Sequence, residues 1–374
     1  MLRLASALCV ILLAGCSPTA SSPRPASKDP LTGARTRAVR YLIAQQRRDG
    51  TWSSDQYAPF KDSTALTPLV LLALKDTEAA SWPGYRRGLI SLSTLVKEDG
   101  SIHEGLLGLS YPVYTSSLAV LLLDAPEFAR ERAAWLAYLR QRQLTEELGW
   151  QPADKPYGGW GYAIALPRKP APGALTSPVE ANLSATVFAL EAMRAAGVPE
   201  NDPAIKKALV FVERCQNFKA KDADPAFDDG GFHFIYDDGA RNKAGPAGRD
   251  QAGRERFRSY GSATADGWRA LRACGLPVDH PRCRAAHAWL SKHFRPGIHP
   301  GNYPEARAGL QPGVYFYYAA ALARCGPDKP EELVADLLKR QRPDGSWCNE
   351  AGAQREDDPL VATALALQAL NRCR

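Results

Sequence analysis

The sequence lacks a region of one charge sign, a membrane-spanning apolar segment and the short motifs of several common enzyme classes. Its 47 Lys and Arg residues and 40 Asp and Glu residues are interleaved, and no basic stripe carries interleaved aromatic residues. Nucleic-acid binding is therefore not indicated. The apolar run at residues 4–13 is too short to span a bilayer as a stable helix. The patterns GxSxG, HExxH and SxxK are absent, so the hydrolases that they define are not indicated.

Chain breakers are abundant instead. The chain has 30 Gly and 29 Pro in 374 residues, together with a hydrophobic fraction of 45%. That fraction is ample for a core, and the many breakers predict short elements joined by structured loops. The length alone permits one large domain or two ordinary ones.

The first residues have the features of an export signal. Arg3 precedes the apolar run, and the run ends in LAGC at Cys16. The ending resembles the lipobox of bacterial lipoproteins, which implies a signal peptide over residues 1–15 and lipidation of Cys16. The Ser- and Pro-rich segment 16–33 then reads as a flexible tether. The resemblance implies an exported protein held on a membrane by its N-terminal lipid, on the periplasmic side of the outer membrane. The alternative is an ordinary secretory signal in which the Cys occurs by chance.

Export would also place the remaining cysteines in an oxidising compartment. Six follow the signal and lipidation positions, an even number that permits three disulfides. Cys274 and Cys283 flank one short turn, so they are the candidate pair. Free buried thiols are the alternative.

The most informative pattern is a repeat. Residues 46–52 read QRRDGTW and residues 341–347 read QRPDGSW, both of the form Q-x3-G-x-W. Each copy follows an amphipathic helical run and precedes a more apolar one, which indicates an array of helical hairpins. Apolar periodicity predicts these helix pairs: 34–48 with 63–76, 83–98 with 112–124, 127–143 with 178–197, 203–217 with 261–275, 281–294 with 313–325, and 330–342 with 359–372.

The two members of each pair differ in polarity. The first is amphipathic and rich in Arg and Lys, whereas the second is apolar nearly all round, as in LTPLVLLAL at residues 66–74. A helix exposed on one face belongs on an outer ring, and one that is apolar all round belongs inside. The sequence thus predicts an all-α fold with an inner and an outer ring of about six helices each. With the Q-x3-G-x-W signature, it resembles the α/α toroid of squalene–hopene cyclases and protein prenyltransferases over residues 34–374.

The signature residues are expected to be structural. An amide in the last turn of an outer helix can bridge unpaired backbone groups to the neighbouring hairpin. A Gly supplies a left-handed stop, and a Trp buries a large ring against the next unit. The residues in these roles are Gln46, Gly50 and Trp52 in the first copy and Gln341, Gly345 and Trp347 in the last.

Alternation of the two rings also predicts where a site lies. Every outer-to-inner loop falls on one rim, beside the N-termini of the inner helices, and three of these loops are long: 144–177, 218–260 and 295–312. Aromatic residues from the loops and inner helices would wall a cavity suited to an apolar or isoprenoid-like ligand. The cavity candidates are Trp160, Tyr260, Trp268, Tyr315 and Tyr317, although aromatic residues of inner helices are more often plain core.

The catalytic motifs of the resembled families are missing. Squalene–hopene cyclases protonate a double bond with an Asp of a DxDD motif, and the nearest segment here, 222–229, has the wrong spacing. The zinc-binding Asp-x-Cys pair of prenyltransferases and the DDxxD motif of terpene synthases are also absent. His280 and Cys283 are close enough to ligate a metal but lack a second pair of ligands. No metal and no cofactor are therefore expected.

Acid–base chemistry could still use carboxylates on the rim. Asp228 and Asp229, with His233 nearby, form the catalytic candidate, because they lie in a long, aromatic-rich loop. Paired Asp residues beside Gly are also ordinary turn and capping residues, which is the competing interpretation.

Three functional hypotheses follow. The first is a membrane-anchored binding protein whose toroid holds an apolar or isoprenoid-like ligand without the usual catalytic motifs. The second is an active enzyme, either a divergent terpene cyclase or transferase or a glycan-processing enzyme using rim carboxylates. The third is a protein-interaction scaffold with a closed, filled centre. Fold alone does not decide among them.

Overall fold

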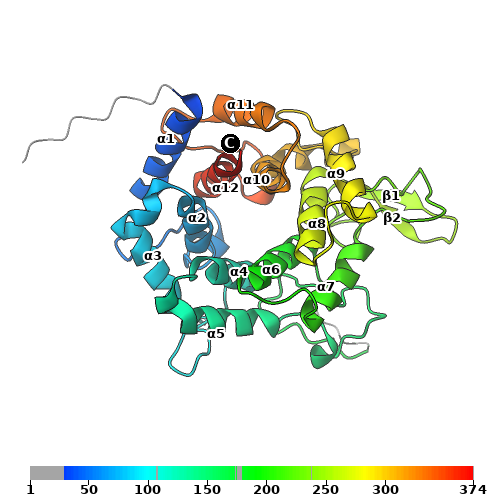
Figure 1. The fold of residues 1–374 in the computed structure, drawn as a ribbon, viewed down its shortest axis with the longest axis horizontal. Coiled ribbons are helices and arrows are strands. Elements are labelled where there is room, and N and C mark those ends of the chain that lie inside the picture. The colour runs from blue at the N-terminus through cyan, green and yellow to red at the C-terminus, as the bar shows by residue number, and fades with distance from the viewer. Residues whose placement is uncertain (1–28, 107, 173, 175–178, 237, 374) are drawn as a thin grey trace, which may run out of the picture.

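The computed structural model describes residues 29–374 except 107, 173, 175–178, 237 and 374. Within these residues, twelve α-helices alternate between an outer and an inner ring, which confirms the predicted toroid of six helical hairpins (Figure 1). The outer helices are α1 (Pro30–Ala44), α3 (Pro83–Ser93), α5 (Ala129–Arg140), α7 (Pro203–Arg214), α9 (Pro281–His293) and α11 (Pro330–Arg340). The inner helices are α2 (Leu66–Lys75), α4 (Pro112–Leu122), α6 (Leu183–Ala195), α8 (Gly261–Ala273), α10 (Tyr315–Cys325) and α12 (Pro359–Arg372).

The inner ring is continuous. Each inner helix packs against the next, from α2 through α4, α6, α8 and α10 to α12, and α12 packs back against α2. Most outer helices begin with Pro, whose fixed φ suits the first helical position and whose missing N–H is not needed there. This use accounts for part of the high proline content.

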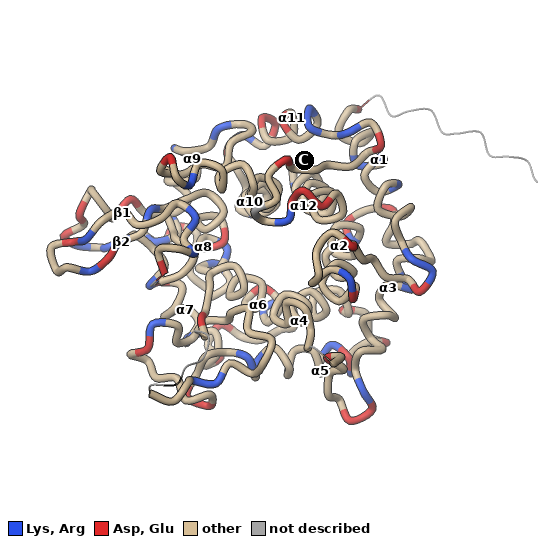
Figure 2. Tube along the Cα trace, turned by 180° about the vertical axis from the view of Figure 1, so that it is seen from behind, with Lys and Arg blue, Asp and Glu red and all other residues tan. Residues whose placement is uncertain are grey.

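Burial follows the polarity of the sequence. In the outer helix α11, Leu333 and Leu337 are the buried residues, whereas in the inner helix α12 all residues but Pro359, Gln368 and Arg372 are buried. Figure 2 shows most charged residues on the outer helices and loops, and fewer of them on the inner ring. The core is thus the double layer between the two rings.

A hydrogen-bonded unit joins neighbouring outer helices. In its first copy, the Gln46 amide donates to the carbonyls of Gly50 (2.9 Å) and of Gly84 in α3 (2.7 Å). The Trp52 indole donates to the Leu42 carbonyl at 2.7 Å, and the ring is fully buried. These contacts are the ones that a structural role for the signature requires.

The described chain contains this unit four times, although the sequence displays it twice. The other copies join Gln143, Gly158 and Trp160; Gln216, Gly230 and Phe232; and Gln341, Gly345 and Trp347. In the two middle copies, 15 and 14 residues separate Gln from Gly, instead of four. Inserted loops therefore conceal the middle copies from a fixed-spacing pattern.

Two further features recur in every copy. The backbone N–H of the aromatic residue donates, at 3.0 Å, to a Thr hydroxyl near the start of the next inner helix: Thr67, Thr186, Thr264 and Thr363 in turn. The Gly has a positive φ, and a Cβ there would meet the next outer helix, as for Gly50, 2.8 Å from Arg87. Both the backbone conformation and the close approach require glycine at this position.

The last copy closes the toroid. Gln341 donates to the carbonyl of Ala34 in α1 at 2.9 Å and accepts a hydrogen bond from the Arg37 guanidinium at 3.1 Å. On the inner ring, the Asn371 amide donates to the carbonyl of Ala73 in α2 at 3.0 Å. Both contacts join the two ends of the domain, some 300 residues apart.

The first helix begins earlier than expected. Asp29 caps it by accepting from the N–H groups of Leu31 and Thr32, and Pro30 takes the first helical position. Residues 30–33 therefore belong to the domain, not to the predicted tether. The predicted signal peptide (1–15), the lipidation site Cys16 and the tether up to residue 28 lie outside the described residues. Among the described helices, none is both long and apolar enough to cross a membrane.

The loops carry only short elements. Strands β1 (Pro246–Arg249) and β2 (Glu255–Phe257) form an antiparallel hairpin between α7 and α8, and it projects from the ring in Figure 1. The short 3-10 helices are η1 (Ala58–Phe60), η2 (Glu78–Ser81), η3 (Pro126–Phe128), η4 (Glu146–Leu148), η5 (Glu305–Leu310), η6 (Pro312–Val314) and η7 (Gly352–Gln354).

The predicted Cys274–Cys283 disulfide is contradicted. Cys274 and Cys283 are both free thiols in the described part of the chain. Cys274 ends α8 and turns toward α7, where its sulfur lies 3.8 Å from the Ile205 carbonyl oxygen, while Cys283 is buried in the first turn of α9. Burial raises the pKa of the Cys274 thiol to about 12, which keeps it protonated and unreactive.

Candidate active site

A cavity of about 340 Å³ lies in the centre of the toroid. It is at the rim that alternation predicted, because every inner helix contributes residues from its start. The lining residues of the inner helices and their N-caps are Ala65, Leu69, Tyr114, Leu118, Ser184, Phe188, Ser262, Ala263, Asp266, Tyr317, Val361 and Leu365. The loops add Phe60, Tyr111, Tyr162, Phe234, Lys243, Val314, Gln354, Arg355 and Glu356. The centre is thus hollow, which contradicts a scaffold with a filled centre.

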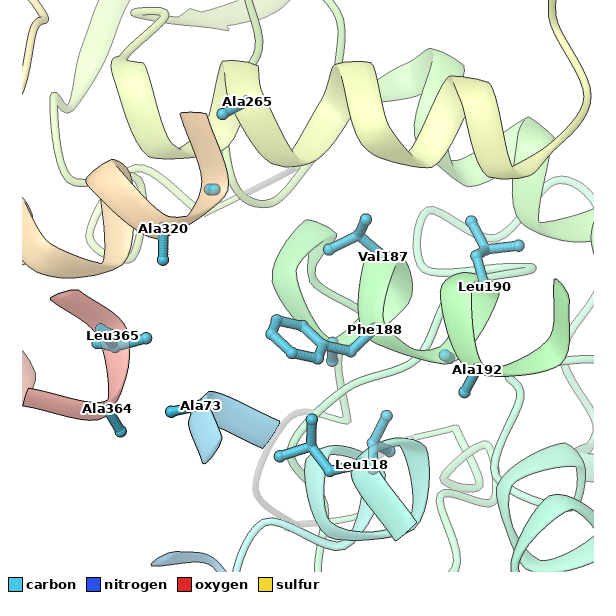
Figure 3. Packing of buried hydrophobic residues seen from close by; sticks show 14 of the residues in the cluster. Ala73, Leu118, Val187, Phe188, Leu190, Ala192, Ala265, Ala320, Ala364 and Leu365 are labelled. Carbon is cyan, nitrogen blue, oxygen red and sulfur yellow. The ribbon is translucent and has the colours of Figure 1, made fainter. Parts of the chain in front are cut away.

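Aromatic rings form one wall of the cavity. Tyr114 stacks on Tyr162 with ring centroids 5.8 Å apart and meets the edge of Phe188 at 4.9 Å. Phe234 continues the wall at 6.2 Å from Tyr162. In Figure 3, Phe188 of α6 and Leu365 of α12 point toward the same central space. Such a wall offers apolar contact area and the negative faces of several π-systems.

A chain of hydroxyl groups crosses this wall. The Tyr162 and Tyr114 hydroxyls lie 3.3 Å apart, and Tyr114 donates to Ser184 at 2.6 Å. Ser184 also hydrogen-bonds the Tyr317 hydroxyl, which donates to Asp266 at 2.7 Å. Burial raises the pKa of Tyr114 to about 12, so this hydroxyl stays protonated. The polar atoms of the wall therefore satisfy one another.

Asp266 ends this chain and begins a network of ion pairs. Its other oxygen accepts from Arg269 at 2.7 Å, and Arg269 also pairs with Glu191 at 2.7 Å. Arg324 binds Glu191 as well, at 2.9 Å. Burial opposes ionisation of Glu191, but the two guanidinium groups lower its pKa to about 2. Burial raises the pKa of Asp266, although Arg269 and Tyr317 favour its carboxylate form. Glu191 is therefore the anion that the arginines neutralise, and Asp266 holds a proton more readily than an ordinary Asp.

Arg355 lies on the loop side of the cavity. Its guanidinium is 5.2–5.4 Å from the ring centroids of Tyr57, Phe60 and Tyr111, and it donates to the Tyr111 hydroxyl. Arg355 and Tyr111 both have left-handed backbone conformations, with φ of 64° and 53°. Such conformations are uncommon for bulky residues and concentrate at functional sites.

Glu356 and Lys243 complete the ionisable groups of the lining. Glu356 is buried and accepts from the backbone N–H groups of Phe316 (2.9 Å) and Tyr317 (2.7 Å) at the start of α10. Burial raises its pKa to about 7, although these donors favour the carboxylate. Burial also lowers the pKa of Lys243 to about 8, although Asp266 and Glu356 favour the ammonium.

Of the predicted cavity residues, Tyr317 lines the cavity. Trp160 is the buried ring of the second structural unit and donates to the Leu139 carbonyl at 2.9 Å. Tyr260 is buried behind the lining, against His299 and Tyr303. Trp268 and Tyr315 each lie two residues from a lining residue, and two residues correspond to a turn of about 200° around a helix. They consequently face outward, Trp268 toward His287 and Tyr315 toward Asp336 of α11.

The structure does not place Asp228, Asp229 and His233 at the cavity. Asp228 pairs with Arg256 at 2.5 Å; burial opposes its ionisation, but the Asp224 N–H and Arg256 lower its pKa. Asp229 accepts from the Ser259 hydroxyl (2.7 Å) and the Trp289 indole (3.0 Å). These contacts fix the turn around Gly230, so the competing structural interpretation fits both carboxylates.

The surroundings of His233 do not fit a catalytic role either. Its ring packs against Phe257, and neither ring nitrogen hydrogen-bonds another described residue. Burial and the charge of Arg256 lower its pKa to about 3, so the imidazole is neutral at ordinary pH. A catalytic base needs a polar partner and a pKa near the working pH, and His233 has neither.

No cluster of three or more metal-ligating side chains is present in the described part of the chain. The His280 side chain accepts from the Arg282 N–H and so caps α9, instead of joining Cys283 at a metal. The polar residues of the cavity are hydrogen-bond donors and carboxylates in an aromatic setting, which suits an organic ligand better than a metal ion.

Sequence reasoning missed Asp266, Lys243, Arg355 and Glu356. Asp266 stands alone, and Glu356 directly precedes Asp357 and Asp358, which read as an ordinary helix start, so no motif marks either residue. Asp266 could have been found as an acidic residue in the apolar stretch of an inner helix, where a buried charge is costly unless it has a function. Lys243 and Arg355 lie in loops, whose course the hydrophobic pattern does not determine.

Comparison with known proteins identifies the fold but no family. No family model and no curated protein sequence matches the chain. Among solved structures, it is similar to the type II terpene cyclase MstE from Scytonema in complex with geranylgeranyl dihydroxybenzoate, with 15% identity, a TM-score of 0.59 and coverage of 92% of this chain and 97% of that one. A protein from Actinoplanes has 15% identity, a TM-score of 0.57 and coverage of 92% and 99%. A glycosidase has 8% identity, a TM-score of 0.52 and coverage of 91% and 96%. The likeness extends along nearly the whole chain and confirms the α/α toroid fold.

Proposed function

We propose that this protein binds one apolar, isoprenoid-like molecule in the central cavity. The observation that carries the proposal is the hollow centre itself, about 340 Å³ walled by aromatic and aliphatic side chains from all inner helices of the described chain. This volume lies within the usual range for small-molecule pockets. The largely apolar lining favours a hydrocarbon chain over a sugar, which would need a dense set of polar partners.

The comparisons are compatible with this ligand class. The MstE complex contains a geranylgeranyl compound, so a toroid of this kind can hold an isoprenoid chain. Lipid anchoring through Cys16, a prediction from the sequence, would place the cavity beside a membrane that supplies apolar molecules. The glycosidase is similar in fold, which would allow a glycan-processing enzyme. The carboxylates that such an enzyme was expected to use, Asp228 and Asp229, are engaged in structural contacts instead.

A second candidate function is acid catalysis on the same ligand. Its basis is Asp266, a buried carboxyl group in the cavity wall whose raised pKa lets it carry a proton. Protonation of a carbon–carbon double bond needs a strong acid, however, and a raised pKa makes Asp266 a weaker one. Binding without turnover is therefore the leading proposal.

The substitution Asp266→Asn distinguishes ligand binding without turnover from acid catalysis by Asp266. Asn keeps the size and one acceptor, so a binding protein should retain its ligand with a changed affinity of at most about tenfold. An enzyme that depends on Asp266 should still bind the molecule but stop converting it, which product analysis by mass spectrometry would detect.

The proposal is tested by native mass spectrometry of the full chain purified from its own cells, followed by organic extraction. A blocked variant, Ala65→Phe, places a ring in the cavity, and Ala80→Phe on the exposed η2 is the matched control. We expect a stoichiometric apolar adduct in the wild type and in Ala80→Phe, and its loss in Ala65→Phe. An adduct retained in all three proteins, or found in none of them, would contradict the proposal.

A further inference from the structure

The Lys243 ammonium faces the cavity without an ion-pair partner among the residues that the structure describes. The Lys243 side chain lines the cavity, with its ammonium 4.8 Å from the centre of the Phe234 ring. Apart from this cation–π contact, it makes no hydrogen bond or ion pair with another described residue. An ammonium that lies in a cavity with few polar partners destabilises the folded protein. Its presence there suggests that another molecule supplies the missing anion.

The nearby carboxyl groups are already engaged. Asp266 accepts from Arg269 on one oxygen and from Tyr317 on the other, both at 2.7 Å. Glu356 accepts the two backbone N–H groups at the start of α10, and Asn349 donates to it at 3.2 Å. Both carboxyls influence the Lys243 ammonium through the cavity, but neither forms an ion pair with it.

The third titratable group near Lys243 is also satisfied. His299 accepts from the Ser262 N–H at 2.9 Å, and its other ring nitrogen lies 3.1 Å from the Tyr303 hydroxyl. Its pKa is lowered to about 3 by burial and by the charge of Lys243, so it adds no positive or negative charge at neutral pH. Among the described residues, none thus forms an ion pair with the Lys243 ammonium.

The surroundings favour an anion in this place. The cavity lies at the N-terminal ends of the inner helices, where their dipoles are positive. The other cation of the lining, Arg355, is already held by the Tyr111 hydroxyl and by three aromatic rings. Lys243 is consequently the group with free donor capacity.

We propose that Lys243 binds the acidic head group, a carboxylate or a phosphate, of an amphiphile whose isoprenoid-like tail fills the cavity. The inference rests on the proposed function and narrows its ligand class from apolar molecules to acidic lipids. The ammonium has three N–H donors and can bind either head group as a compact charge.

The test uses three probes with the same tail: farnesol, farnesoic acid and farnesyl phosphate. Their dissociation constants are measured at pH 7 by isothermal titration calorimetry with the purified full chain. A charge-assisted hydrogen bond in a partly buried site should make at least one acidic probe bind about 10- to 100-fold tighter than farnesol. Preference for the phosphate over the acid assigns the head group to a phosphate, and the reverse assigns it to a carboxylate.

Three variants test whether the preference for acidic probes depends on the charge of Lys243. Lys243→Met should abolish the preference for the acidic probe while leaving farnesol affinity within about threefold, because the tail contacts remain. Lys243→Arg should restore the preference, since it restores the charge. Lys206→Met removes an exposed lysine from α7 and is the control, with the wild-type preference expected. Thermal unfolding checks that each variant is folded. Lys243→Met should melt at a temperature no lower than that of the wild type, because it removes an unpaired charge.

The outcomes separate this inference from the proposed function. If no probe binds the wild type, the proposed function fails. If farnesol binds as tightly as the acidic probes, or if Lys243→Met weakens all probes alike, the head-group inference is overturned while the cavity remains a binding site.

Discussion

Gln341 closes the toroid, and its removal gives a quantitative test of how the ring is held. Its amide donates to the carbonyls of Ala34 (2.9 Å) and Gly345 (3.0 Å) and accepts from Arg37. In Gln341→Ala, two backbone carbonyls lose their donor. At about 0.5–1.5 kcal/mol for each hydrogen bond, the variant should lose about 1–3 kcal/mol of unfolding free energy. For a chain of this size, that loss lowers Tm by about 2–6 °C.

The assay is thermal unfolding followed by circular dichroism, with Gln45→Ala as the control. Gln45 is the neighbouring glutamine of the first structural unit and is exposed, so its variant should melt with the wild type. Gln143→Ala, in a buried copy of the same unit, should lose at least as much stability as Gln341→Ala. The reasoning is refuted if Gln341→Ala melts at the wild-type temperature, or if Gln45→Ala loses as much.

Two further predictions concern the buried imidazole and the N-terminus. His233→Leu should make the protein more resistant to acid. The folded pKa of about 3 lies below the ordinary value of 6.5, so acidification through 6.5 protonates the unfolded chain first and destabilises the wild type. Between pH 7 and pH 5, the advantage of the variant in urea unfolding should grow by about 2 kcal/mol, and a constant advantage would contradict the neutral, structural assignment. Cys16→Ser should move the protein from the membrane fraction to the soluble fraction, and an unchanged distribution would contradict lipid anchoring.

The sequence was sufficient for the fold because the fold repeats. Apolar periodicity located all twelve described helices, and contrast in polarity assigned each to its ring. The predicted start of the first helix, residue 34, differs from the observed one, because Asp29 and Pro30 provide a helix start inside the Ser- and Pro-rich segment. The two concealed structural units, at Gln143 and Gln216, required the structure, since loop insertions separate the Gln from its Gly.

The candidate site was predicted in its position but not in its residues. Alternation of the two rings placed it correctly at the rim with the long loops. Individual aromatic residues could not be assigned, because one position along a helix turns a side chain by about 100° and residues two apart face away from each other. Tyr317 and Tyr315 illustrate this, since the first lines the cavity and the second contacts the outer ring. Loop residues such as Lys243 follow no periodic pattern at all.

The most direct test of the central claim is a titration of the full chain with geranylgeraniol, followed through intrinsic tyrosine and tryptophan fluorescence. The account predicts saturable binding of one molecule, because tyrosines wall the cavity, and loss of the signal in the blocked variant Ala65→Phe. A signal that does not saturate, or one that Ala65→Phe leaves unchanged, would contradict binding in the central cavity.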